Sequence, residues 1–129
     1  MRFSNEIFSD PKFKVDVLKV EIPVDLSFIE GFGESIISRK DAIKHFQTAA
    51  NAVGQVPFVY LSAGVSYEWF RASLIMAKDA NINFSGFVCG RAIWSEAIDV
   101  FGKKGKKSLI EWLNDIGKKR LAELISIVE

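Results

Sequence analysis

Apolar side chains gather in three short segments that predict β-strands. The segments are residues 15–22, 56–62 and 84–89, which end at Pro23, Gly64 and Gly90. Each is rich in β-branched or aromatic residues, as strands are. The second and third are almost continuously apolar, which predicts parallel strands covered on both faces.

Helical patterns occupy the stretches between and after these strands. Ser38 and Ser66 are each expected to cap a helix whose apolar residues follow the helical period. A short helix is expected near Trp94, and a last helix from about Ser108 with an interruption at Gly117. The basic residues 103–107 predict a solvated turn. Strands and helices that alternate in this way indicate an α/β protein with a parallel sheet and right-handed crossovers.

Composition narrows the class of protein. The 129 residues carry 17 basic and 16 acidic side chains, and 49% are hydrophobic, so the chain can bury the core of one domain. The near-neutral balance provides no electrostatic footprint for nucleic acid or for an anionic membrane. The single cysteine, Cys89, excludes an internal disulfide. The sequence has no signal-peptide pattern and no apolar run of about 18 residues, so a cytoplasmic protein is expected.

Lys19 stands in the first predicted strand among valine, leucine and isoleucine. Burial disfavours an ammonium ion and lowers the pKa of a lysine. Because only the neutral amine attacks a carbonyl, such a lysine is suited to Schiff-base chemistry. An ion pair with Asp16 or Glu21, or a side chain that reaches solvent, is the commoner explanation of a lysine in this position. Both explanations stay open on the residues alone.

Two turns, after the second and third predicted strands, suit a phosphate group. In the first, Ser62 and Gly64 precede a helix N-terminus, where backbone N–H groups and a hydroxyl can bind an anion. In the second, Gly90 allows a close approach of the backbone, and Arg91 offers charge and paired hydrogen bonds to phosphate oxygens. An ordinary turn and a surface arginine explain either turn alone. Together they match the phosphate site that the last strands of a (β/α)₈ barrel often form.

Five segments carry a resemblance that covers almost the whole chain. They are residues 16–21 (DVLKVE), 23–24 (PV), 30–32 (EGF), 60–66 (YLSAGVS) and 89–94 (CGRAIW). In this order and spacing, they resemble the C-terminal region of the tagatose 1,6-bisphosphate aldolases, a family of class I (Schiff-base) aldolases. The related sulfofructose-phosphate aldolases share part of the pattern and are an alternative.

The resemblance implies a (β/α)₈ TIM barrel, of which residues 1–129 would form the C-terminal part with about three βα units. Lys19 would be the Schiff-base lysine. The phosphate of the dihydroxyacetone-phosphate half would be bound by Ser62, Gly64, Gly90 and Arg91. The implied reaction cleaves D-tagatose 1,6-bisphosphate to dihydroxyacetone phosphate and glyceraldehyde 3-phosphate, in lactose and galactose catabolism. The iminium on Lys19 would be the electron sink, so no metal or other cofactor is expected.

The length of the chain qualifies this expectation. A closed (β/α)₈ barrel takes about 250 residues, and the strand that carries the family's proton-transferring glutamate precedes the lysine strand and is not in the sequence. Parallel strands that do not close leave open edges and an uncovered inner face. We therefore expect self-association or pairing with a missing N-terminal half, a wetter Lys19, and weak or no activity of the chain alone. The alternatives are a non-catalytic sugar-phosphate-binding or interaction module and a small flavodoxin-like domain.

Overall fold

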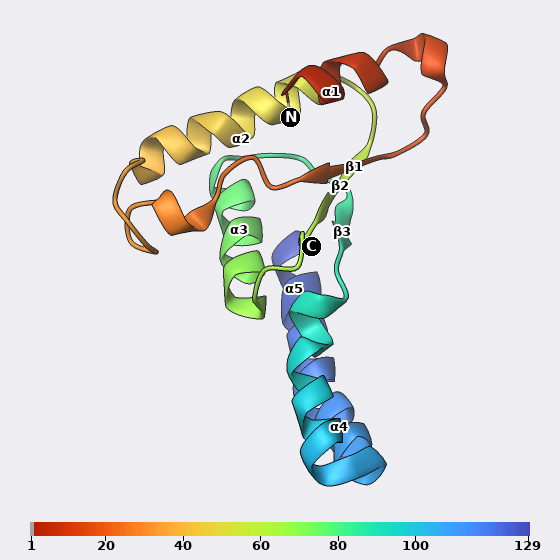
Figure 1. The fold of residues 1–129 in the computed structure, drawn as a ribbon. Coiled ribbons are helices and arrows are strands. Elements are labelled where there is room, and N and C mark those ends of the chain that lie inside the picture. Colours follow the sequence, from red (N-terminus) through yellow and green to blue (C-terminus); the bar gives the residue numbers. More distant parts are fainter. Residues whose placement is uncertain (1) are drawn as a thin grey trace.

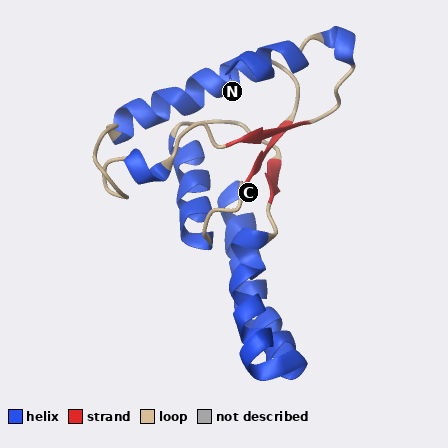
Figure 2. Cartoon of the chain, viewed as in Figure 1, coloured by secondary structure: helices blue, strands red, loops and turns tan. Residues whose placement is uncertain are grey.

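The computed structural model describes residues 2–129, with side chains from Ser4 onward. The strands are β1 (Leu18–Glu21), β2 (Phe58–Leu61) and β3 (Gly86–Val88). The helices are α1 (Arg2–Phe8), α2 (Arg39–Val53), α3 (Tyr67–Asp79), α4 (Arg91–Trp112) and α5 (Lys118–Val128), with 3₁₀ turns at Pro11–Phe13 and Leu26–Phe28 and a π-helical turn at Leu113–Gly117. Strands and helices alternate from β1 to α4, which confirms the predicted α/β class (Figure 2). Across residues 2–129, no helix combines the length and apolarity needed to cross a membrane.

The strands form an open parallel sheet in the order β1-β2-β3 (Figure 1). Lys19 lies beside Val59, and Val59 lies beside Gly86. Because the spatial order equals the chain order, each crossover moves one strand along the sheet in the same direction, as in successive βα units of a barrel. The three strands found in the described residues do not close on themselves.

Helices α2 and α3 cover one face of the sheet. Tyr60 is the centre of this core, with 1% of its surface exposed, and its ring meets Phe46 of α2 edge-on at 6.0 Å between centroids. Phe70 of α3 packs on Phe87 of β3 at 6.1 Å. Such tilted aromatic pairs add to the stabilisation from apolar burial. The core therefore lies between the sheet and this helix layer.

The opposite face of the sheet is uncovered. Lys19, Glu21 and Val88 are exposed on it, and the row Glu21–Leu61–Val88 runs across all of its strands. The prediction that the second and third strands are covered on both faces is wrong for this chain. The uncovered inner face, which was expected from the short length, is present.

Local sequence signals explain how the helices begin. The Ser38 hydroxyl accepts a hydrogen bond from the Asp41 amide at 3.1 Å, and the Ser66 hydroxyl accepts one from the Trp69 amide at 3.3 Å. Both predicted N-caps are confirmed. They satisfy backbone donors that no helical carbonyl can reach. Helix α4, which was expected to start near Trp94, begins earlier, at Arg91.

The C-terminal region is a helical hairpin that extends away from the sheet. Figure 1 shows the first part of α4 running outward, whereas the last part of α4 and then α5 return beside it, so that the C-terminus lies near the strands. The chain turns at Gly105, whose φ of 76° is left-handed. The turn predicted in the basic segment is thus confirmed, although the residues that flank Gly105 are helical. Gly117 does not break the last helix; it ends the π-helical turn that joins α4 to α5.

Candidate functional site

The turn after β2 is tight because two consecutive residues adopt left-handed conformations. Ala63 has a φ of 52° and Gly64 a φ of 82°. Left-handed backbone costs a non-glycine residue about 1–2 kcal/mol, so Ala63 stores strain that the surrounding contacts must hold. The buried Ser62 accepts a hydrogen bond at its carbonyl from the Val65 amide at 3.1 Å. This arrangement directs the chain from the carboxyl end of β2 into the N-terminus of α3.

The turn after β3 leads directly into α4. Gly90 is the N-cap residue, and no side chain of the described residues caps this helix end. The Gly90 carbonyl accepts hydrogen bonds from the Ile93 and Trp94 amides at 2.9 and 3.1 Å. The first amides of α4 therefore have no helical acceptor and carry the positive end of the helix dipole.

Arg91 brings these two turns together. A Cβ atom placed on Gly64 would lie 3.1 Å from the guanidinium carbon of Arg91 and 3.1 and 3.2 Å from its terminal nitrogens. The guanidinium therefore rests against the bare backbone of Gly64, where a larger residue would displace it. Of the predicted phosphate-binding residues, Gly64 and Arg91 are in contact, and Ser62 and Gly90 lie in the same two turns.

Trp94 is a neighbour of this site that sequence reasoning did not include. A Cβ atom on Gly90 would lie 3.0 Å from Nε1 of the Trp94 indole. The i, i+4 spacing, which places side chains over the preceding helical turn, is the signal that could have found it. The position of the indole is thus the reason for a residue without a side chain at Gly90, since its φ of −130° does not require glycine.

Lys19 is exposed on the uncovered face of the sheet. The alternative that its side chain reaches solvent is therefore confirmed, as is the wetter lysine expected of an open sheet, and the buried surroundings that its apolar neighbours suggested are not observed. Among the ion pairs of the described residues, none joins Lys19 to Asp16 or Glu21, so the ion-pair alternative is not observed. Lys19 lies level with Val59, three residues before Ser62. Because a strand rises about 3.3 Å per residue, the backbone of Lys19 is roughly 10 Å from the turn that follows β2.

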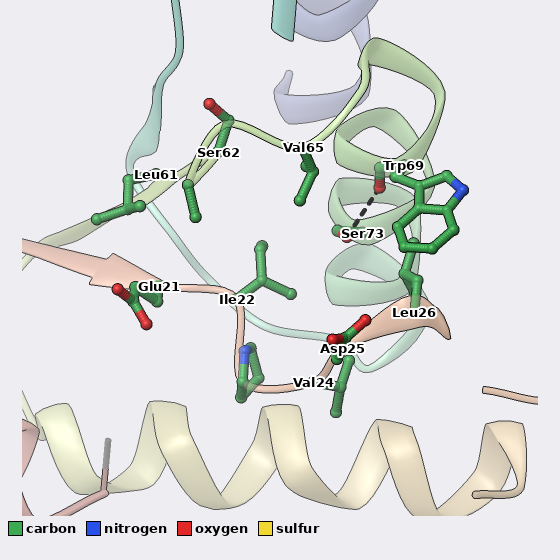
Figure 3. A pocket seen from close by; sticks show the side chains of 12 residues that line it. Glu21, Ile22, Val24, Asp25, Leu26, Leu61, Ser62, Val65, Trp69 and Ser73 are labelled. Atoms are coloured by element: carbon green, nitrogen blue, oxygen red, sulfur yellow. Dashed lines mark hydrogen bonds between the residues drawn. The ribbon is translucent and has the colours of Figure 1, made fainter. Parts of the chain in front are cut away.

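A pocket of about 460 Å³ opens at the carboxyl ends of β1 and β2, next to α3 (Figure 3). Ile22 and Val65 point into it, and the Ser73 hydroxyl on its far wall donates to the Trp69 carbonyl at 2.8 Å. Hydrogen bonds from the Ser27 hydroxyl and amide hold the pKa of the Asp25 carboxyl at its rim below the ordinary value. Ser62 also lines this pocket, whereas Gly64 and Arg91 do not, so the structure does not bring all of the predicted phosphate-binding residues to one cavity.

Other groups near the site offer little chemistry. Burial raises the pKa of the Cys89 thiol, which keeps it protonated and weakly nucleophilic. Burial also raises the pKa of the Tyr60 phenol. Among the residues that the structure describes, no group of three or more His, Cys, Asp and Glu side chains is placed to hold a metal ion.

The amino-acid sequence matches a family of known proteins. The model of the DeoC/LacD family aldolases matches residues 4–96, a stretch that contains Lys19 and both turns. The chain belongs to the DeoC/LacD aldolase family. Tagatose 1,6-diphosphate aldolase of Staphylococcus haemolyticus is 42% identical over 126 residues, which is 96% of the chain and 38% of that relative. The enzymes of the same name from Staphylococcus epidermidis and Staphylococcus aureus are 41% identical over the same shares. The chain thus spans about 38% of the length of these relatives.

Proposed function

We propose that this chain carries the Schiff-base lysine and the phosphate site of a class I aldolase that cleaves D-tagatose 1,6-bisphosphate. The observation that carries the proposal is the contact of the Arg91 guanidinium with Gly64, which joins two turns at the carboxyl edge of the sheet. A family that acts on ketose bisphosphates needs a cationic, backbone-lined site at that edge. Relatives that are 41–42% identical are named tagatose 1,6-diphosphate aldolase, which supports tagatose 1,6-bisphosphate as the substrate.

Lys19 would supply the covalent step. Its neutral amine adds to the ketose C2 carbonyl, and loss of water forms an iminium. Cleavage of the C3–C4 bond sends its electron pair into the iminium, which becomes an enamine, while the C4 hydroxyl loses its proton and leaves as an aldehyde. Protonation of the enamine at C3 and hydrolysis release dihydroxyacetone phosphate and regenerate Lys19. The iminium is the electron sink, so the scheme assigns no role to a metal or another cofactor.

The phosphate on C1 would be held by the two turns. Helices α3 and α4 begin shortly after β2 and β3 end, and free amides at helix N-termini bind phosphate oxygens. The Arg91 guanidinium adds charge and paired hydrogen bonds. Ser62 would contribute a hydroxyl, while Gly64 and Gly90 keep the backbone open to the ligand. The site would recognise the dihydroxyacetone-phosphate half.

Residues 1–129 would then be the C-terminal part of a (β/α)₈ barrel. The sheet is open and the face that bears Lys19 is uncovered, so other strands must complete the site before the lysine is sheltered from water. We propose that a second copy or a separate N-terminal half provides them. By itself the chain would be weak or inactive, because the glutamate expected to transfer protons lies on a strand that is not among these residues.

The exposure of Lys19 favours a second candidate function, namely sugar-phosphate binding without catalysis. A Schiff-base lysine works in a site sheltered from water, and in this chain nothing shelters Lys19. In that case the Gly64–Arg91 site would bind dihydroxyacetone phosphate, and replacing Lys19 with alanine would leave binding unchanged.

Borohydride trapping with dihydroxyacetone phosphate, followed by peptide mass spectrometry, tests the proposal. Hydride reduces the iminium to a stable secondary amine, so a reduced adduct on the peptide that contains Lys19 is expected. Lys19→Arg should abolish the adduct, whereas Lys40→Arg, at another exposed lysine, should not. A wild-type chain that binds dihydroxyacetone phosphate but forms no adduct at Lys19 would establish the non-catalytic function instead.

A further inference from the structure

We infer that Arg120 of α5 is a positioning residue that sets the spacing of the two phosphate turns. The inference rests on the proposed function and names a residue that lies beyond the stretch matched by the family model, which ends at residue 96. Arg120 touches none of the proposed substrate-binding residues. It acts through the first turns of α3 and α4, the two helices that begin at those turns.

The Arg120 side chain is held in a defined place. It is 12% exposed, and its guanidinium lies over the ring of Tyr67 at 4.8 Å and near the ring of Trp112 at 5.5 Å from the centroids. Stacking between two aromatic rings suits the flat, delocalised cation of arginine and is poorly reproduced by the compact ammonium of lysine. The position of the guanidinium is therefore tied to Tyr67, the first residue of α3.

Hydrogen bonds tie the same guanidinium to α4. One terminal nitrogen donates to the Ile93 carbonyl at 3.0 Å, and the other donates to both carboxylate oxygens of Glu96 at 2.9 and 3.0 Å. Glu68, the second residue of α3, lies 3.8 Å away. One side chain thus joins the first turn of α3 to the first two turns of α4.

A second contact holds α5 against α3. Glu123, one helical turn after Arg120, accepts hydrogen bonds from the Tyr67 hydroxyl and from Arg71. Tyr67 is therefore fixed from its ring by Arg120 and from its hydroxyl by Glu123. This arrangement keeps α5 in place when only the Arg120 contacts are weakened, so a conservative change at Arg120 can be studied in a folded chain.

The spacing that Arg120 sets matters because the proposed phosphate site is shared between two helix starts. The Arg91 guanidinium reaches Gly64 only if the N-terminus of α4 stays beside the turn that precedes α3. The helices diverge from there, and β2 and β3 are short strands of four and three residues. A bridge between the first turns of α3 and α4 is therefore the most direct brace for the Gly64–Arg91 contact.

The test compares trapping at Lys19 by a ligand with a phosphate and by one without. The ratio of borohydride-trapping rates for dihydroxyacetone phosphate and dihydroxyacetone measures the phosphate contribution alone. Arg120→Lys keeps the positive charge but removes the hydrogen bonds that the two terminal nitrogens make to Ile93 and Glu96. It should lower this ratio about tenfold, which is the loss expected for a hydrogen bond to a charged group. The rate with dihydroxyacetone should not change. Glu96→Gln, at an exposed carboxylate, should lower the ratio by a smaller factor.

Arg39→Lys is the matched control, because Arg39 also joins two helices, through Asp79 at 2.6 Å, but far from the turns. It should leave the ratio unchanged even if it lowers the melting temperature. An unchanged ratio in folded Arg120→Lys and Glu96→Gln would overturn the inference and leave the proposed function standing. A wild-type chain that shows no preference for dihydroxyacetone phosphate would overturn the proposed phosphate site, and the inference with it.

Discussion

At the scale of single residues, the two tyrosines of the chain have hydroxyls in opposite surroundings. The Tyr60 hydroxyl is buried and has no hydrogen-bond partner among the described residues. The Tyr67 hydroxyl donates to the Glu123 carboxylate. An unpaired buried hydroxyl costs free energy, whereas a paired one contributes to stability. The same chemical change at these two positions should therefore have opposite effects.

Tyr60→Phe should stabilise the chain by about 1 kcal/mol, because it removes an unpaired polar atom and keeps the aromatic packing. Tyr67→Phe should destabilise it by roughly 1 kcal/mol, because Glu123 loses a donor. Urea denaturation of both variants measures these differences in the free energy of unfolding. Equal destabilisation by both would show that the Tyr60 hydroxyl has a partner.

The same residues predict how the chain responds to alkali. Burial, followed by the hydrogen bond to Glu123, raises the pKa of Tyr67 to about 12 from the ordinary value of 10.0. Since folding favours the protonated phenol, its contribution to stability is complete below pH 10 and is lost as pH rises toward 12. Tyrosinate absorbance should appear later in the native chain than in denaturant. Titration of Tyr67→Phe isolates Tyr60, whose pKa burial also raises.

At the scale of the elements, the turn between β2 and α3 combines backbone strain with a side-chain contact. Gly64 and Gly54 both have left-handed φ values, 82° and 68°. A Cβ atom at Gly54 would meet nothing within 4 Å, whereas at Gly64 it would meet the Arg91 guanidinium. Substitution of Gly54 therefore measures only the cost of the backbone conformation, whereas substitution of Gly64 adds the displacement of Arg91.

Gly64→Ala and Gly54→Ala should each destabilise the chain by about 1–3 kcal/mol, the cost of a positive φ at alanine. Only Gly64→Ala should also weaken binding of dihydroxyacetone phosphate, because its methyl group displaces Arg91. Isothermal titration calorimetry with this ligand, together with thermal melts, checks both statements. Unchanged binding in Gly64→Ala would remove Arg91 from the proposed phosphate site.

At the scale of the whole molecule, the uncovered face of the sheet is the main departure from a closed α/β fold. Val88 of β3 is 49% exposed on this face, next to Leu61 in the register. In the described residues, β1 and β3 each have one unpaired edge. Open strand edges beside apolar side chains are templates for pairing with another chain.

We therefore expect the chain to self-associate in a concentration-dependent way, as measured by sedimentation velocity. Val88→Lys should shift the population toward the monomer, because a charge on an edge strand opposes pairing. Ile36→Lys is the control, since Ile36 is 67% exposed but lies in a loop away from the sheet. A wild-type chain that is a monomer at low micromolar concentration would contradict this expectation.

Local features of this protein could be determined from its sequence. The strand segments, the Ser38 and Ser66 caps and the turn in the basic segment depend on residues close together in the chain, so their spacing and chemistry were sufficient to predict them. The two glycine-containing turns followed for the same reason. Their identification as phosphate-binding elements came from the resemblance to an aldolase family and is still a prediction.

The tertiary structure decided which surfaces are covered and which distant residues meet. Lys19 has the sequence surroundings of a buried residue, yet it is exposed, because coverage depends on elements far along the chain or outside it. The Arg91 contact with Gly64 and the Arg120 bridge between α3 and α4 join residues that no periodic pattern relates. Sequence periodicity reports which face of one element is apolar, whereas only packing in three dimensions determines what lies against that face.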